Sequence, residues 1–127
     1  TGSIVIVVAT DAPLLPHQLK RVARRAALGL GRMGSIAGNG SGDLFLAFST
    51  ANAAALRGAP LAQSASLGND FLDPLFAATV QATEEAIVNA MVAARDMQGT
   101  AGRYARALPQ DALVRLLAQY GRLRPPP

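Results

Sequence analysis

The sequence contains no cysteine and only one histidine among its 127 residues. The absence of cysteine excludes a disulfide framework, a thiolate zinc site and a thiol nucleophile. The single histidine, His17, excludes a metal site built from several histidines of this chain, and it leaves a Ser-His-Asp triad only one possible base. We therefore expect no metal and no cofactor.

Aromatic residues are also few, with four Phe, two Tyr and no Trp, although Lys and Arg outnumber Asp and Glu by twelve to eight. Four of the basic residues lie between positions 20 and 25. Because no run of aromatics accompanies them for base stacking, we interpret them as one solvated helix face and expect no nucleic-acid partner. No segment approaches the ~18 consecutive apolar residues that span a bilayer, so we expect no membrane partner either.

Two apolar runs predict buried strands. Residues 3–9 form a continuous β-branched run, and residues 43–49 form a second apolar run. Continuous rather than alternating apolar residues are typical of strands that are covered on both faces. Two strands do not make a stable sheet alone, so the sequence indicates further strands from another chain or from a removed N-terminal part. We expect a single α/β domain over residues 1–127, with the order β-α-β-α-α.

Three helices are predicted from apolar spacing. The first follows Pro16, carries the basic residues on its outer face and is expected to end at Gly29 and Gly31. The others cover residues 69–94 and 109–120, and the residues between the second strand and the second helix are interpreted as a loop with a local helix near 53–56. The buried positions predicted for the last two helices are Leu72, Phe76, Val80, Ile87 and Met91, and Ala112, Leu113, Leu116, Leu117 and Tyr120.

Two local features suggest chemistry. A hydroxyl residue, Thr1 or Ser3, directly precedes the first strand, and a glycine-rich turn over residues 38–43 directly precedes the second. A Ser or Thr at a free N-terminus can use its own α-amine as general base, because that amine titrates near ~7.7–8.0. If the two strands are parallel neighbours, Ser41 and Asp43 lie beside the first residues, where Ser41 can hydrogen-bond the nucleophile or its amine and Asp43 can orient that network.

These residues carry a resemblance to a known family. The carrying segments are Ser3 to Leu14, Pro16 to Arg21, Ala37 to Asp43, Phe48 to Asn52 and Thr83 to Ala90. Together they resemble the β-subunit of the self-processing L-aminopeptidase/D-amidase/D-esterase family, which includes β-peptidyl aminopeptidases and a nylon-oligomer hydrolase. The resemblance runs in order over nearly the whole chain.

The resemblance implies an enzyme made as one precursor that cuts itself before a Ser or Thr. The new N-terminal residue of the smaller β chain is the nucleophile, and no metal is needed. The larger α chain stays bound and completes an α/β/β/α sandwich, and several αβ pairs usually assemble. The implied activity is release of N-terminal residues from peptides, amides or esters through an acyl-enzyme. Cytoplasmic and periplasmic locations both stay open.

Alignment with the family assigns candidate residues. Ser3 matches the nucleophile, because it lies eight residues before Asp11 as the family pattern requires, and Gly2-Ser3 resembles the self-cleaved pair. Thr1 remains the alternative nucleophile. Ser41 matches the second active-site Ser, and Asp43 matches an acidic position that is Glu in β-peptidyl aminopeptidases.

Two readings of the glycine-rich turn stay open at this point. Asn39 and Gly40 are candidates for substrate contact, although Asn39 also suits a plain turn. The alternative function is a non-catalytic β-α-β module that binds phosphate or nucleic acid through the Gly38–Gly42 loop and the basic helix.

Overall fold

The structure, a computed structural model, describes residues 2–58 and 60–123. It comprises two compact units, which we call unit 1 (Thr1–Ala86) and unit 2 (Ile87–Pro127). Among the described residues, no helix has the length and apolar character needed to cross a membrane.

Unit 1 is organised around two strands, β1 (Val5–Thr10) and β2 (Leu44–Ser49). They are parallel neighbours, paired in register from Val5 opposite Leu44 to Thr10 opposite Ser49. The helix α1 (Pro16–Arg32) connects them, which gives a β-α-β crossover. Both strand predictions are confirmed, and the pairing is the parallel one on which the site hypothesis depends.

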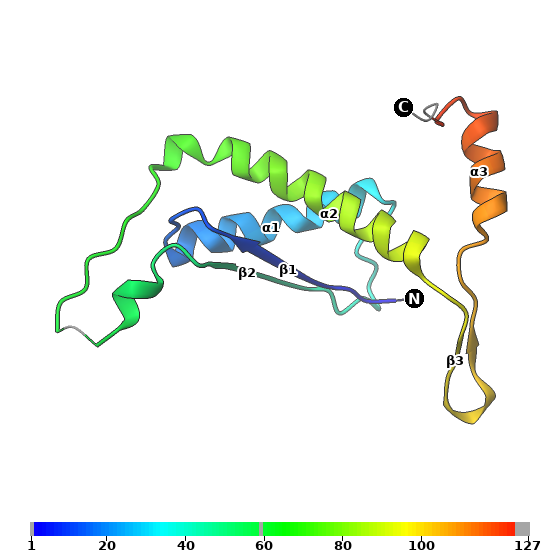
Figure 1. The fold of residues 1–127 in the computed structure, drawn as a ribbon, viewed down its shortest axis with the longest axis horizontal. Coiled ribbons are helices and arrows are strands. Elements are labelled where there is room, and N and C mark those ends of the chain that lie inside the picture. The colour runs from blue at the N-terminus through cyan, green and yellow to red at the C-terminus, as the bar shows by residue number, and fades with distance from the viewer. Residues whose placement is uncertain (1, 59, 124–127) are drawn as a thin grey trace. The chain divides into compact units, whose positions relative to one another are not determined.

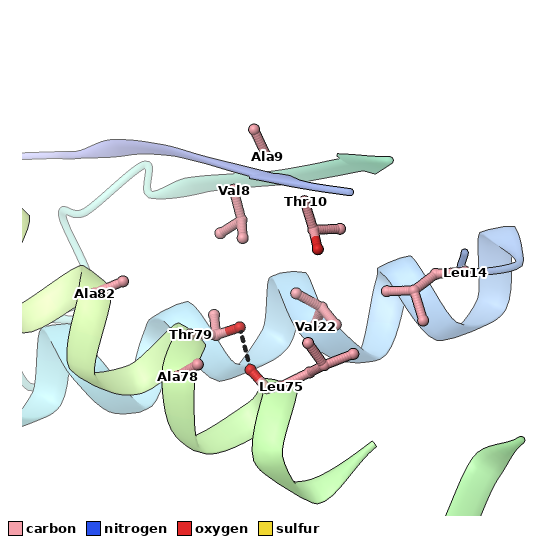
Figure 2. Close-up of a pocket in the computed structure, with 9 residues that line it drawn as sticks. All are labelled: Val8, Ala9, Thr10, Leu14, Val22, Leu75, Ala78, Thr79 and Ala82. Atoms are coloured by element: carbon pink, nitrogen blue, oxygen red, sulfur yellow. Dashed lines mark hydrogen bonds between the residues drawn. The ribbon is translucent and has the colours of Figure 1, made fainter. Parts of the chain in front are cut away.

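Two helices cover one face of this sheet (Figure 1). Val8 of β1 and Ala47 of β2 pack against a buried apolar cluster from the two helices and their preceding loops. Figure 2 shows Val8 and Thr10 pointing toward α1 and α2 (Asp73–Ala93), while Ala9 points away from them. The buried members of this cluster are Leu14, Val22, Leu72 and Phe76.

The opposite face of the sheet is exposed within this chain. Residues alternate between half-buried and exposed along both strands, and the outward side chains are apolar. Val5 is 68% exposed and Leu44 is 64% exposed. The sequence predicts strands covered on both faces, and this chain by itself covers one.

Helix α1 does not end at its glycines, so that prediction is wrong. It continues through Gly29 and Gly31 to Arg32, and the turn that follows contains Gly34 with a φ of 95°. Gly29 is buried against α2, where an added Cβ would lie 2.7 Å from both the Val80 carbonyl oxygen and the Thr83 Cβ. Gly29 therefore permits a close approach of two helices rather than terminating one.

The basic face of α1 is only partly solvated. The guanidinium of Arg25 lies 3.9 Å from the centroid of the Phe76 ring, and that of Arg21 lies 5.1 Å from it. Arg32 forms an exposed ion pair with Glu84, with 3.3 Å between Nη1 and Oε2. The prediction of a wholly solvated face is thus wrong for Arg21 and Arg25, because their stems and charges cover an aromatic ring of α2.

Helix α2 begins later than predicted and buries a different stripe. A 3₁₀ turn, η2 (Asn69–Phe71), precedes it, and a further turn, η1 (Ala53–Leu56), confirms the local helix expected there. Leu72 and Phe76 are buried as predicted, and Thr79 and Thr83 continue the buried stripe. Met91, predicted to be buried, is 42% exposed.

Unit 2 contains a hairpin that the sequence did not predict. Strands β3 (Met97–Gln98) and β4 (Tyr104–Ala105) pair antiparallel around the turn η3 (Thr100–Gly102). The observed order is therefore β-α-β-α-β-β-α, with short 3₁₀ turns, rather than β-α-β-α-α.

Helix α3 (Gln110–Gln119) confirms the third predicted helix, and Gly121 follows it with a φ of 62°. Its predicted inward face is not buried, since α3 contains no buried residue. Leu116 and Tyr120 are 53% and 71% exposed.

The hairpin of unit 2 is closed by polar contacts. The Asp96 carboxylate accepts hydrogen bonds from the Tyr104 hydroxyl and the Ala107 amide. The bond from Tyr104, followed by that from Ala107, lowers the pKa of Asp96 below its ordinary 3.8. The same bond to Asp96 raises the pKa of Tyr104 above its ordinary 10.0.

Candidate active site

The parallel register brings the residues before β1 next to those before β2. Because Val5 lies opposite Leu44, the segment Ser3-Ile4 runs beside Gly42-Asp43. The Leu44 amide donates to the Ile4 carbonyl over 3.0 Å, which extends the pairing beyond the strands. All three predicted catalytic residues therefore lie at the amino ends of two adjacent strands.

Three hydrogen bonds connect these residues. The Gly42 amide donates to Ser3 Oγ over 2.8 Å. The Ser41 hydroxyl donates to Asp43 Oδ1 over 2.6 Å, and the Ile4 amide donates to the same oxygen over 3.1 Å. A single carboxylate oxygen thus fixes both the second serine and the backbone that carries the first.

Burial differs among the members of the site. Ser3 is exposed, whereas Ser41 and Asp43 are half-buried. Within the described residues, no Lys or Arg forms an ion pair with Asp43. The charge of Asp43 is therefore met by two neutral donors, which leaves the carboxylate able to accept a further cationic donor.

The remaining predicted residues lie at the edge of this arrangement. Asn39 and Gly40 form an exposed turn, closed by a 2.8 Å bond from the Ser41 amide to the Gly38 carbonyl. Gly2 is exposed beside Ser3. Thr1, the alternative nucleophile, lies outside the described residues.

The site also includes two backbone groups that the sequence does not predict. They are the amides of Gly42 and Ile4, which contact Ser3 and Asp43. Side-chain patterns carry no signal for them, because every non-proline residue has an amide. Extending the expected parallel pairing residue by residue is the step that predicts these two contacts.

An apolar cavity of unit 1 lies away from this site. It has a volume of about 140 Å³, and Figure 2 shows it between β1 and the two helices, where Val8, Thr10 and Thr79 are among its lining residues. Successive strand residues advance ~3.3 Å, so Ser3 and the cavity residues of β1 are separated by about 20 Å along the strand. The described residues also contain no group of three His, Asp or Glu side chains placed to hold a metal ion.

Comparison with known proteins places these residues in a family. The pattern of peptidase family S58 matches residues 1–105. The beta-peptidyl aminopeptidase BapA of Sphingosinicella microcystinivorans is 52% identical over 123 residues, which are 96% of this chain and 31% of that protein. The chain thus spans about a third of the length of the curated relatives that it matches.

Solved structures are similar in fold as well as sequence. An L-aminopeptidase D-Ala-esterase/amidase from Ochrobactrum anthropi, described as a variant of the Ntn hydrolase fold, has a TM-score of 0.86 and 49% identity. The match covers 96% of this chain and 35% of that one. A Burkholderia sp. beta-aminopeptidase has a TM-score of 0.82 and 46% identity, over 97% of this chain and 36% of that one. This chain therefore has the fold of the corresponding part of an Ntn hydrolase.

Proposed function

Because the chain belongs to peptidase family S58, we propose that it is the nucleophile-bearing part of a self-cleaving N-terminal-nucleophile aminopeptidase or amidase. The observation that carries this proposal is the convergence of Ser3, Ser41 and Asp43 at the amino ends of β1 and β2. The relatives support the class of reaction, since their names describe aminopeptidases and an esterase/amidase.

The proposed assembly is based on the exposed apolar face of the sheet. We propose that residues 1–127 act as one domain, the β subunit, and that a larger α subunit from the same precursor packs a second sheet on the exposed apolar face. That contact completes an α/β/β/α sandwich and buries Val5 and Leu44, which are now more than half exposed. Several such αβ pairs form the working oligomer.

Catalysis then proceeds from Ser3. After self-cleavage between Gly2 and Ser3, the free α-amine of Ser3 takes the proton from Oγ as Oγ attacks the scissile carbonyl. The protonated amine returns that proton to the leaving amine, and an ester between the substrate acyl group and Ser3 remains. Water then hydrolyses the ester and regenerates the hydroxyl.

We propose that Ser41 and Asp43 stabilise the positive charge on that amine. The Ser41 hydroxyl donates its only proton to Asp43, so its lone pairs are available to accept a bond from the α-ammonium of Ser3. Asp43 supplies the negative charge that stabilises this ammonium through Ser41. Asn39 and Gly40, in the exposed turn beside them, are proposed substrate contacts.

Substrates are proposed to be peptides, amides or esters with a free N-terminal residue. The family resemblance implies a Glu at this position in β-peptidyl aminopeptidases, and Asp43 is one methylene shorter. In this chain the Asp43 carboxylate accepts a hydrogen bond from the Ile4 amide.

The decisive experiment is the N-terminal sequence and intact mass of the chain after expression of the whole precursor. A processed chain that begins at Ser3 supports the proposal. A processed chain that begins at Thr1 transfers the nucleophile to Thr1, and an uncut precursor that still hydrolyses substrate contradicts self-activation.

The phosphate- or nucleic-acid-binding alternative is not favoured. In the Gly38–Gly42 loop, the amides of Ser41 and Gly42 already donate to Gly38 and Ser3. Two of the basic residues lie over Phe76 instead of facing a ligand. A loop whose amides are satisfied internally offers fewer donors to an anion.

A further inference from the structure

The Gly42 amide stands out because it contacts the reacting atom itself. It donates to Ser3 Oγ over 2.8 Å, while Gly2 still precedes Ser3 in the chain. In this chain the Ser3 nitrogen is therefore a peptide nitrogen and not a free α-amine. Ser41 donates to Asp43, which also accepts from the Ile4 amide, and within the described part of the chain neither side chain forms a hydrogen bond to Ser3 Oγ.

We infer that the backbone amide of Gly42 is a catalytic group that aims Ser3 Oγ at the carbonyl in both self-cleavage and substrate hydrolysis. This inference rests on the proposed function. A hydroxyl oxygen has two lone pairs, and the amide occupies one of them. The hydroxyl then turns so that the second lone pair is free to attack, and the donor holds Oγ in one orientation.

Neighbouring hydrogen bonds hold the Gly42 amide in position. The Leu44 amide donates to the Ile4 carbonyl over 3.0 Å, and the Ile4 amide donates to Asp43. Both bonds lie on the strand side of the contact between Gly42 and Ser3, and they hold the two adjoining backbones together. A nucleophile held in one orientation loses less rotational freedom when it attacks.

The same donor serves two reactions. In self-cleavage, Ser3 Oγ attacks the Gly2 carbonyl carbon, the C–N bond between Gly2 and Ser3 breaks, and the proton from Oγ passes to the Ser3 nitrogen. Water then hydrolyses the ester and releases the Gly2 carboxylate. In substrate hydrolysis, Oγ attacks a foreign carbonyl, and the Gly42 amide is unchanged in both cases.

The test compares two substitutions at one position in the whole precursor. Gly42→Pro removes the N–H, whereas Gly42→Ala keeps it. Gly42 does not have a left-handed φ, and an added Cβ would lie in ordinary contact, 3.7 Å from Ser3 Oγ. The proline variant is expected to cleave itself and to turn over an ester substrate about 10- to 100-fold more slowly than the alanine variant, with the loss in kcat rather than KM.

Two results would overturn the inference, and they are distinguishable from failure of the proposed function. Equal rates for the proline and alanine variants, in a protein that Ser3→Ala inactivates, contradict the role of Gly42 alone. A Ser3→Ala variant that still cleaves and hydrolyses contradicts the proposed function. If circular dichroism shows that the proline variant is unfolded, glycolic acid at position 42 replaces the N–H by oxygen, and the same loss is expected.

Discussion

The two units of the chain are stabilised by different kinds of contact. Unit 1 has a buried apolar cluster, including a fully buried Leu72, and it carries every candidate catalytic residue that the structure describes. In unit 2, no described residue is buried, and its hairpin is closed by hydrogen bonds to one exposed carboxylate. A catalytic constellation requires positions held by packing, and among residues 2–58 and 60–123 only those of unit 1 provide a buried cluster.

The largest effect is expected at Ser3, the proposed nucleophile of unit 1. Ser3→Ala should abolish self-cleavage and lower kcat by more than ~10⁴-fold, because an alanine side chain cannot form the acyl ester. Intact mass and ester hydrolysis measure both effects. A variant that stays cleaved at Gly2 and active would show that Ser3 is not the nucleophile.

Asp43→Asn tests the electrostatic role of Asp43, because it removes the negative charge and keeps the shape of the side chain. The amide oxygen can still accept from Ile4 and Ser41, so the fold should persist. The α-ammonium of Ser3 loses its negative partner, and kcat should fall by ~10²-fold or more. Asp70→Asn, an exposed carboxylate of the 3₁₀ turn η2, is the matched control and should keep the parent kcat. Equal kcat values for both variants would contradict the electrostatic role.

Glycine substitutions in α1 test the packing of unit 1. Gly29→Ala should destabilise the protein by about 1–3 kcal/mol, because its Cβ would overlap a backbone oxygen and the Thr83 side chain of α2. Gly31→Ala, two residues later with no atom near its Cβ, should stabilise it by about 0.5–1 kcal/mol. Urea midpoints measure both changes, and shifts of the same sign would contradict the close helix approach.

The smallest effect is expected in unit 2. Tyr104→Phe should raise the pKa of Asp96 toward its ordinary 3.8, because the hydroxyl is the main cause of the lowered value. Carbon-detected NMR titration of the Asp96 carboxyl measures this change. An unchanged pKa would show that the Ala107 amide alone sets it.

The pH dependence of the hairpin follows from the same two groups. The lowered pKa of Asp96 means that its contribution is complete above 3.8 and disappears as the pH falls through the folded-state pKa. The raised pKa of Tyr104 means that its contribution disappears as the pH rises through its own folded-state pKa, above 10.0. The protection factors of the β3 and β4 amides, which are exchange rates corrected for their intrinsic pH dependence, should therefore be highest between these limits.

The accuracy of sequence reasoning differed between regions for identifiable reasons. The sequence does not predict the hairpin of unit 2, because the residues with positive φ in its turn are Ala101 and Gly102, at 56° and 71°. Such turns are usually recognised by Asn or Asp before Gly, not by Ala. The sequence predicts too early an end for helix α1, because a glycine typically terminates a helix. The role of Gly29 depends instead on a second helix that is distant in sequence.

The sequence by itself determined the two long strands, the three helices and the candidate residues. Continuous apolar runs specified the strands, and apolar spacing specified the helices, because burial of one helix face imposes a period on the chain. The family resemblance singled out Ser3, Ser41 and Asp43. What only the tertiary structure decided is the set of contacts across long separations: the register of β1 with β2, the bond from Gly42 to Ser3 and the contact of Gly29 with α2. Those contacts join residues 39 to 54 positions apart, where no local periodicity relates one residue to the other.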